Sequence, residues 1–243
     1  MTDKSLYDRL NTVGIQFIMV YDLVRKTRKT AKKVTRYEIA YNYLRKAIIE
    51  HELSPGSPIV EQDISNRLEI SRTPVREALK QLEIEGLIQV SPVRGYFVAE
   101  INLMDVTEIF DLRLALELLA LKTSISKITS EEIGELEVLF AKLSEDCSPE
   151  KFYETDRHLH DLITHRSCNR RLVQFLSNIN SQIERFRHIA SLKPERLRHS
   201  REEHEEILKY IKEHDLEKTE AALTLHINHV KESVMHVCEK HIY

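Results

Sequence analysis

The sequence pattern typical of β-strands is confined to one short stretch of this chain. Residues 87–90 and 96–98 are short β-type runs, and residues 91–95 (Ser-Pro-Val-Arg-Gly) between them are typical of a hairpin turn. No such pattern follows residue 100, and the whole chain holds only 5 Gly and 6 Pro. Leu, Glu, Lys, Ile and Arg dominate elsewhere and favour helix. The sequence therefore predicts a mainly α protein with a single hairpin.

Three helices are expected before the hairpin. The first starts near residue 37, where Ile39, Tyr43 and Ala47 recur on one face, and the Ser-Pro-Gly-Ser-Pro run at 54–58 ends it. A short helix is expected over 61–68. A third helix, over 72–85, has Ser71 as its N-cap and Gly86 at its end. Residues 37–99 thus have the order helix, helix, helix, hairpin.

The rest of the chain, residues 101–243, is expected to form an all-α bundle. Breaks near 102–103, 128–130, 146–149, 168–169, 193–194 and 214–215 separate about six or seven helices. Helices are expected to start at Ser130, which Glu131 and Glu132 follow, and at Ser148, which Pro149 and Glu150 follow. We expect one domain over 34–100 and a second over 101–243.

Charge divides along the same boundary. Residues 1–100 hold 16 Lys and Arg against 13 Asp and Glu, whereas the remainder holds 20 against 26. A basic first part indicates a nucleic-acid partner. Within it, residues 1–33 form an extension with a basic cluster over 25–33, which is either an arm that contacts DNA phosphates or a solvated linker.

Composition also excludes several classes of protein. Three cysteines are too few for a disulfide framework and fit a reducing cytoplasm. No apolar run reaches the length of a membrane-spanning helix, so we expect no membrane partner.

The helix expected over 72–85 carries the side chains of a DNA-reading helix. Arg72 and Arg76 are four residues apart on one exposed face, with Ser71 and Thr73 beside them. Arginine suits bidentate contact with guanine in the major groove. At the hairpin tip, Arg94 and Gly95 would meet the DNA backbone or minor groove. An isolated arginine pair would merely solubilise a surface helix, but the pair here lies in a complete helix-turn-helix with a hairpin wing.

This stretch resembles the GntR family of regulators. The resemblance rests on Leu-Ser-Pro-Gly at 53–56, Ser-Arg-Thr-Pro-Val-Arg-Glu-Ala-Leu at 71–79, Leu-Glu-Ile-Glu-Gly-Leu-Ile at 82–88 and Arg-Gly-Tyr-Phe-Val at 94–98. It implies that Arg72, Thr73, Arg76 and Gly95 contact double-stranded DNA, and that a homodimer binds a short palindromic operator. Gln62 departs from the family pattern, since several members carry a DNA-contacting Arg there.

Histidines point to a metal in the second half. Asp156 and His160 have the i, i+4 spacing that converges on one helix face, and His204 and His226 lie on later helices. One carboxylate and three imidazoles suit Zn²⁺, Ni²⁺, Mn²⁺ or Fe²⁺. Spacing alone does not single out these residues, because the chain has 12 histidines.

The second half resembles the ligand-binding domain of the FadR subgroup of GntR regulators, the FCD type. The resemblance rests on residues 111–117, 156–160 and 204–207 and on His226. It implies one divalent transition metal per chain, Zn²⁺ or Ni²⁺ by preference, held by Asp156, His160, His204 and His226. It also implies that Arg113 holds the carboxylate of a small organic acid effector. The alternative for Arg113 is an ion pair with Glu117.

The expected function is therefore ligand-controlled transcription, by repression, in the cytoplasm, with no enzymatic activity. Arg185 is a candidate second cation in the effector pocket. Three alternatives stay open: a regulator for which the metal ion itself is the signal, a purely structural metal site, and a metal-dependent hydrolase.

Overall fold

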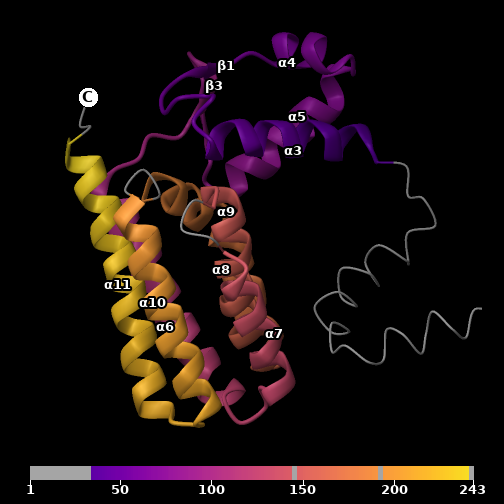
Figure 1. The fold of residues 1–243 in the computed structure, drawn as a ribbon. Helices are drawn as coiled ribbons and strands as arrows, with labels where there is room; N and C mark the ends of the chain where they lie inside the picture. The colour runs from indigo at the N-terminus through magenta and orange to yellow at the C-terminus, as the bar shows by residue number, and fades with distance from the viewer. Residues whose placement is uncertain (1–33, 144–146, 191–193, 241–243) are drawn as a thin grey trace, which may run out of the picture.

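Helices form most of both halves of the chain in the computed structural model, which describes residues 34–143, 147–190 and 194–240. The basic extension expected over residues 1–33 lies outside the described residues. Figure 1 shows a smaller N-terminal domain seated across one end of a long helical bundle. Two separate clusters of buried apolar side chains form the two cores.

The N-terminal domain packs three helices against a small sheet. Its elements in chain order are α3 (Arg36–Ile49), β1 (Pro58–Ile59), α4 (Glu61–Leu68), α5 (Arg72–Ile84), β2 (Ile88–Ser91) and β3 (Gly95–Val98). The three expected helices and the hairpin are confirmed. The sheet has a third strand that the sequence did not predict, because β1 is two residues long and begins with a proline. It pairs with β3 in the antiparallel order β1-β3-β2.

Local chemistry sets the limits of these helices. Thr35 and Glu38 form a reciprocal capping box at the start of α3. Gly86 follows α5 with a φ of 73°, a left-handed conformation that glycine adopts without strain. Ser71 occupies the N-cap position of α5, as expected, but its side chain makes no capping hydrogen bond. Apolar residues on the inner faces of α3 and α5 close the core: Ala40, Leu44, Ile48, Val75, Leu79 and Leu82.

Six helices are seen in the described part of the C-terminal domain, namely α6 (Leu103–Ser124), α7 (Ser130–Ala141), α8 (Pro149–Arg166), α9 (Arg170–Ala190), α10 (Pro194–Lys212) and α11 (Leu216–Lys240). Asn102 caps α6 and Ser148 caps α8. Helix α7 starts at Ser130, as expected, and Thr129 before it forms a capping box with Glu132. The long helices lie side by side (Figure 1), and the apolar side chains of one shared core fill the bundle between them.

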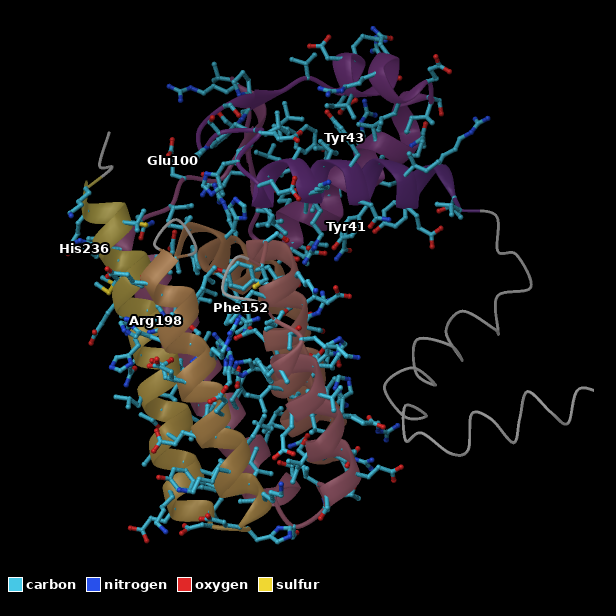
Figure 2. All side chains as sticks on the ribbon, viewed as in Figure 1. Tyr41, Tyr43, Glu100, Phe152, Arg198 and His236 are labelled. Atoms are coloured by element: carbon cyan, nitrogen blue, oxygen red, sulfur yellow. The ribbon has the colours of Figure 1, made fainter. Side chains whose placement is uncertain are left out.

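The two domains meet where α3 and the end of α5 lie on α9. Arg45 of α3 pairs with Glu184 of α9, their Nη2 and Oε2 atoms 2.6 Å apart. Glu85, directly after α5, accepts hydrogen bonds from Ser181 of α9 and from Tyr41 of α3. Figure 2 shows Tyr41 on the side of α3 nearer the bundle. Charged and hydroxyl groups therefore make up much of this junction.

No helix among the described residues is long and apolar enough to cross a membrane. The three cysteines are unpaired.

Candidate metal centre and DNA interface

Four predicted ligands meet in the middle of the bundle. Asp156 and His160 project from adjacent turns of α8, while His204 comes from α10 and His226 from α11. All four side chains are buried, and one ligand atom from each lies within 4.8 Å of the others. The structure thus brings together Asp156 and the three histidines, out of twelve in the chain, that the resemblance implied.

The ligand atoms have the separations of a coordination shell. Asp156 Oδ1 lies 3.6 Å from His160 Nε2, 3.0 Å from His204 Nε2 and 3.8 Å from His226 Nε2. Ligands about 2.1 Å from a shared cation are separated by roughly 3 to 4 Å. The observed distances match this range, so these residues would hold a divalent transition metal.

Carboxylates behind two of the histidines orient their rings. His160 Nδ1 lies 2.5 Å from Glu117 Oε2, and His226 Nδ1 lies 2.7 Å from Glu203 Oε2. Because an ionised carboxylate only accepts, each Nδ1 carries the proton and each Nε2 presents a lone pair to the cluster. Carboxylate–histidine–metal triads have this arrangement.

Burial and neighbouring charges set the ionisation of the cluster. Burial would raise the pKa of Asp156, but Arg187 and His160 hold it well below its usual value. Burial lowers the pKa of His204, and burial together with His204 lowers the pKa of His226. Burial opposes ionisation of Glu203, yet hydrogen bonds from His226 and Arg196 lower its pKa to about 2. An anionic Asp and neutral imidazoles are the protonation states that a metal requires.

The four predicted ligand atoms offer one another more hydrogen-bond acceptors than donors. Lone pairs from Asp156, His160 and His226 converge, and only His204 Nε2 could supply a proton among them. His204 Nε2 lies 3.3 Å from His226 Nε2, while its own Nδ1 is buried without a hydrogen bond. Phe140 and Phe152 pack on the His204 ring and exclude water from that side, and Figure 2 shows Phe152 inside the bundle. A cation would relieve the convergence of acceptors.

Arg113 of α6 lies beside the cluster and is fully buried. Its Nε donates to Glu117 Oε1 at 2.7 Å, which is the expected ion pair. Its Nη2 lies 3.0 Å from His160 Nε2, and its Nη1 has no hydrogen-bond partner. Arg113 is therefore paired with Glu117, but its Nη1 lacks an acceptor.

A cavity of about 190 Å³ opens next to Arg113 and His160. Two further guanidinium groups line it, those of Arg157 and Arg187. Arg187 Nη1 also lies 2.7 Å from Asp156 Oδ2. Three arginines therefore line this cavity beside His160, against two carboxylates, Glu117 and Asp161. The planar guanidinium groups suit an anionic ligand.

Arg185, the expected second pocket cation, does not line this cavity. Its Nη2 donates to the carbonyl oxygen of Ala99 at 2.9 Å, in the link between the two domains. Successive helical residues are rotated by about 100°, so residues two apart lie on nearly opposite faces. Arg187 occupies the position toward the cavity that was expected for Arg185.

The predicted DNA-contacting residues lie in the N-terminal domain, at the start of α5 and at the tip of the hairpin between β2 and β3. Ser71, Arg72, Thr73 and Arg76 are all exposed on the first two turns of α5. Arg76 makes a bidentate pair with Glu61 of α4, at 3.0 and 2.8 Å. Arg72 donates to Gln62, the residue that departs from the family pattern. In the free protein, therefore, α4 holds both arginines in position.

The hairpin tip forms the second part of this interface. Arg94 and Gly95 are exposed, and Gly95 has a φ of 70° with open space where a Cβ would lie. Val93 beside them is 93% exposed. A glycine in this left-handed turn lets the backbone approach a flat or charged surface closely.

Several site residues were not identified from the sequence. Glu203 is one of them: it orients His226 and also contacts His229 and Arg196. Arg157, Arg187 and Glu61 were not considered. The one available signal was adjacency, since Glu203 precedes His204 and Arg157 follows Asp156.

Comparison with known proteins agrees with both halves of this arrangement. Residues 36–98 match the family described as bacterial regulatory proteins of the gntR family, and residues 108–229 match the FCD domain.

Curated relatives cover most of the chain. The chain is 28% identical over 216 residues to the HTH-type transcriptional regulator YdhC of Bacillus subtilis, covering 87% of this chain and 96% of the relative. It is 29% identical over 203 residues to the HTH-type transcriptional repressor RspR of Escherichia coli, covering 81% and 88% respectively.

Solved structures show the same fold. Escherichia coli McbR superposes with a TM-score of 0.69 at 23% identity, covering 85% of this chain and 99% of that one. The metal-free FCD domain of another transcriptional regulator gives a TM-score of 0.54 at 24% identity, over 59% of this chain and all of that one. The chain belongs to the GntR family of bacterial regulatory proteins and is a transcriptional regulator with an FCD domain.

Proposed function

We propose that this regulator is a repressor whose affinity for its operator is controlled by a small carboxylate bound beside a metal in the FCD domain. The observation that carries the proposal is the buried guanidinium of Arg113, which has one donor without a partner and borders a cavity next to four converging ligand atoms. A buried donor without an acceptor costs free energy, and a ligand that supplies the acceptor would remove this cost.

Asp156, His160, His204 and His226 would hold the metal, which we expect to be Zn²⁺ or Ni²⁺ at one ion per chain. Once bound, such a cation offers open coordination positions to a carboxylate oxygen. His160 Nε2 now accepts from Arg113 Nη2. When His160 serves as a ligand, Arg113 loses that acceptor, and two donors of its planar fork are then available to an anion.

Two exposed arginines and the hairpin tip support the DNA-binding part of the proposal. Arg72 and Arg76 would read base edges in the major groove, with Ser71 and Thr73 on phosphates and Arg94 and Gly95 at the backbone or minor groove. We propose a homodimer on a palindromic operator in the cytoplasm, where two copies present two such helices.

We further propose a sensory rather than a catalytic site. Glu203, which directly precedes His204 in the sequence, accepts from His226, His229 and Arg196. These contacts engage it as an orienting group, which argues against a role as general base.

The test measures metal content and DNA affinity on the same purified samples. An operator is first selected from a random DNA library with the wild-type protein. Wild type and Asp156→Ala/His204→Ala are then compared by elemental analysis and by titration of that DNA. We expect about one metal per chain in wild type and none in the variant.

Each outcome separates the alternatives. Absence of metal from both proteins after growth in metal-supplemented medium would contradict the metal part of the proposal. DNA affinity that follows free Zn²⁺ or Ni²⁺ with no carboxylate present would instead identify the ion as the signal. Metal-dependent turnover by wild type would contradict the sensory role.

A further inference from the structure

Helix α9 separates the FCD cavity from the DNA-binding domain. On one side Asn180, Ile183 and Arg187 line the cavity. On the other, Ser181 and Glu184 contact the DNA-binding domain through Glu85 and Arg45. The same two turns of α9 therefore carry residues that line the cavity and residues that contact the DNA-binding domain.

The carboxylate of Glu184 is shared across this helix. Its Oε2 lies 2.6 Å from Nη2 of Arg45, in the DNA-binding domain. Its Oε1 accepts from Asn180 Nδ2 at 2.9 Å and lies 3.5 Å from Arg157 Nη1. Both Asn180 and Arg157 line the effector cavity. Glu184 is thus bound by two cavity residues and one residue of the other domain.

Arg157 has room to change partner. A second cavity of about 190 Å³ lies at the domain junction, lined by Ile49 and Glu50 of the DNA-binding domain together with Arg157, Glu184 and Arg187. The side chain of Arg157 is 44% exposed and so is not fixed by packing, unlike the buried Arg113. It borders both cavities and can pair with a ligand in one or with Glu184 between them.

We propose that Arg157 and Glu184 are the coupling residues of this regulator: an anion in the FCD cavity competes with Glu184 for Arg157, and so strengthens the pairing of Glu184 with Arg45. This inference rests on the proposed carboxylate site and adds how its occupancy reaches the DNA-binding domain. Since one carboxylate divides its interaction between two guanidinium groups, removing one of them favours the other.

The coupling has a defined sign in both directions. Ligand binding stabilises the Arg45–Glu184 contact, which fixes the DNA-binding domain against α9. By reciprocity, loss of Arg45 lets Glu184 pair more fully with Arg157 and weakens ligand binding. Arg45 does not line the cavity, so a purely local account of ligand binding predicts no such effect.

The first experiment measures citrate binding to full-length, zinc-loaded protein by calorimetry. Arg45→Gln should weaken binding by about fivefold, the lower end of typical coupling between sites. Arg36→Gln is the matched control, because Arg36 is exposed on the same helix. Glu184→Gln should tighten binding, and adding Arg45→Gln to it should change nothing further. Equal affinity of wild type and Arg45→Gln, or an undiminished Arg45→Gln effect in the Glu184→Gln background, would overturn the coupling.

A second experiment needs no ligand. A Glu-specific protease can cut the link between the domains at Glu100, which is exposed and which Figure 2 shows in that link. If the junction must open for cleavage, Arg157→Gln should slow cleavage several-fold and Arg45→Gln should accelerate it. Arg36→Gln should leave the rate unchanged.

The two experiments separate two failures. Wild-type protein that binds no citrate, with cleavage rates that follow the predicted order, would count against citrate as a ligand of the proposed site and support the coupling. Citrate binding in wild type with cleavage that is not slowed by Arg157→Gln would retain the site and overturn the coupling.

Discussion

The two domains use arginine in opposite ways. Arg76 in the DNA-binding domain has a side chain that is 55% exposed and pairs with Glu61 at the surface. Arg113 in the FCD domain is fully buried against Glu117. Exposed ion pairs contribute little because water screens them and the side chains lose freedom. Buried pairs are held by the cost of leaving either charge alone.

This difference indicates where each domain places its specificity. An arginine held weakly at the surface can exchange its carboxylate for a DNA base or phosphate at small cost. An arginine buried with an unpartnered donor already has a fixed orientation, and it gains most from a ligand that supplies the missing acceptor. Four predictions test this contrast, beginning with the largest expected effect.

The largest effect should come from breaking the buried pair. Arg113→Ala leaves Glu117 as an uncompensated buried charge and should lower the free energy of unfolding by about 3 to 5 kcal/mol. Arg76→Ala, the exposed counterpart, should lower it far less, because water screens its pair with Glu61. Urea unfolding of metal-free protein, followed by circular dichroism, measures both. Similar losses for the two variants would remove the contrast between the domains.

DNA affinity should show the reverse order. Arg76→Ala should weaken operator binding by roughly 10- to 100-fold, the usual value of a bidentate base contact. Arg198→Ala removes the same charge from an exposed position on α10 of the FCD domain and serves as control. Fluorescence anisotropy with the selected operator measures both. An equal loss in the control would reduce the role of Arg76 to net charge alone.

The next largest effect should be on metal affinity, when the carboxylate that orients His226 is changed. Glu203→Gln keeps the size of the side chain that holds His226 but removes its charge. We expect metal affinity to fall by about 10-fold, as for other residues that orient ligands. Competition with a chromogenic chelator gives the affinity. Glu205→Gln, an exposed change on the same helix, should bind metal as wild type does.

The smallest effect is expected at the junction between the domains. His51 stacks on His188 with ring centroids 6.0 Å apart, and burial, Arg185 and His188 together lower its pKa from 6.5 to about 4. The unfolded chain therefore binds a proton more readily, so stability is complete above pH 6.5 and falls as the pH drops toward 4.

His51→Asn should reduce this loss. Asn tolerates the left-handed backbone at position 51, where φ is 60°. We expect the fall in Tm between pH 7 and pH 5 to be about 2 °C smaller in the variant. Differential scanning calorimetry at both pH values measures it. Identical pH dependence in variant and wild type would assign the effect to other groups.

Much of the fold could be predicted because its signals are local. The expected helix over 61–68 coincides with α4, and Ser148 with Pro149 marks the start of α8. Strand β1 could not be predicted, since two residues have no alternation and are held only by pairing with β3. Helix α7 starts at Ser130 as expected, and its cap is the preceding Thr129, whose side chain accepts from the Glu132 N–H.

The site was predictable only in part. Family resemblance pointed to the four residues that the structure brings together, which spacing among twelve histidines could not. Arg187 and Arg185 could not be told apart, because the face that α9 turns to the cavity depends on how the helices pack. Glu184 could not be found either, since its partners Arg45 and Arg157 come from distant parts of the chain.

The most direct test of the account is a carboxylate titration read through DNA affinity. Zinc-loaded wild-type protein bound to its selected operator is titrated with citrate and other small carboxylates, beside Arg113→Met. We predict that at least one carboxylate shifts operator affinity of wild type by fivefold or more, within the usual range of coupling between sites, and that Arg113→Met does not respond. Operator affinity that stays constant at saturating carboxylate, or that shifts equally in Arg113→Met, would contradict the claim that this site controls DNA binding.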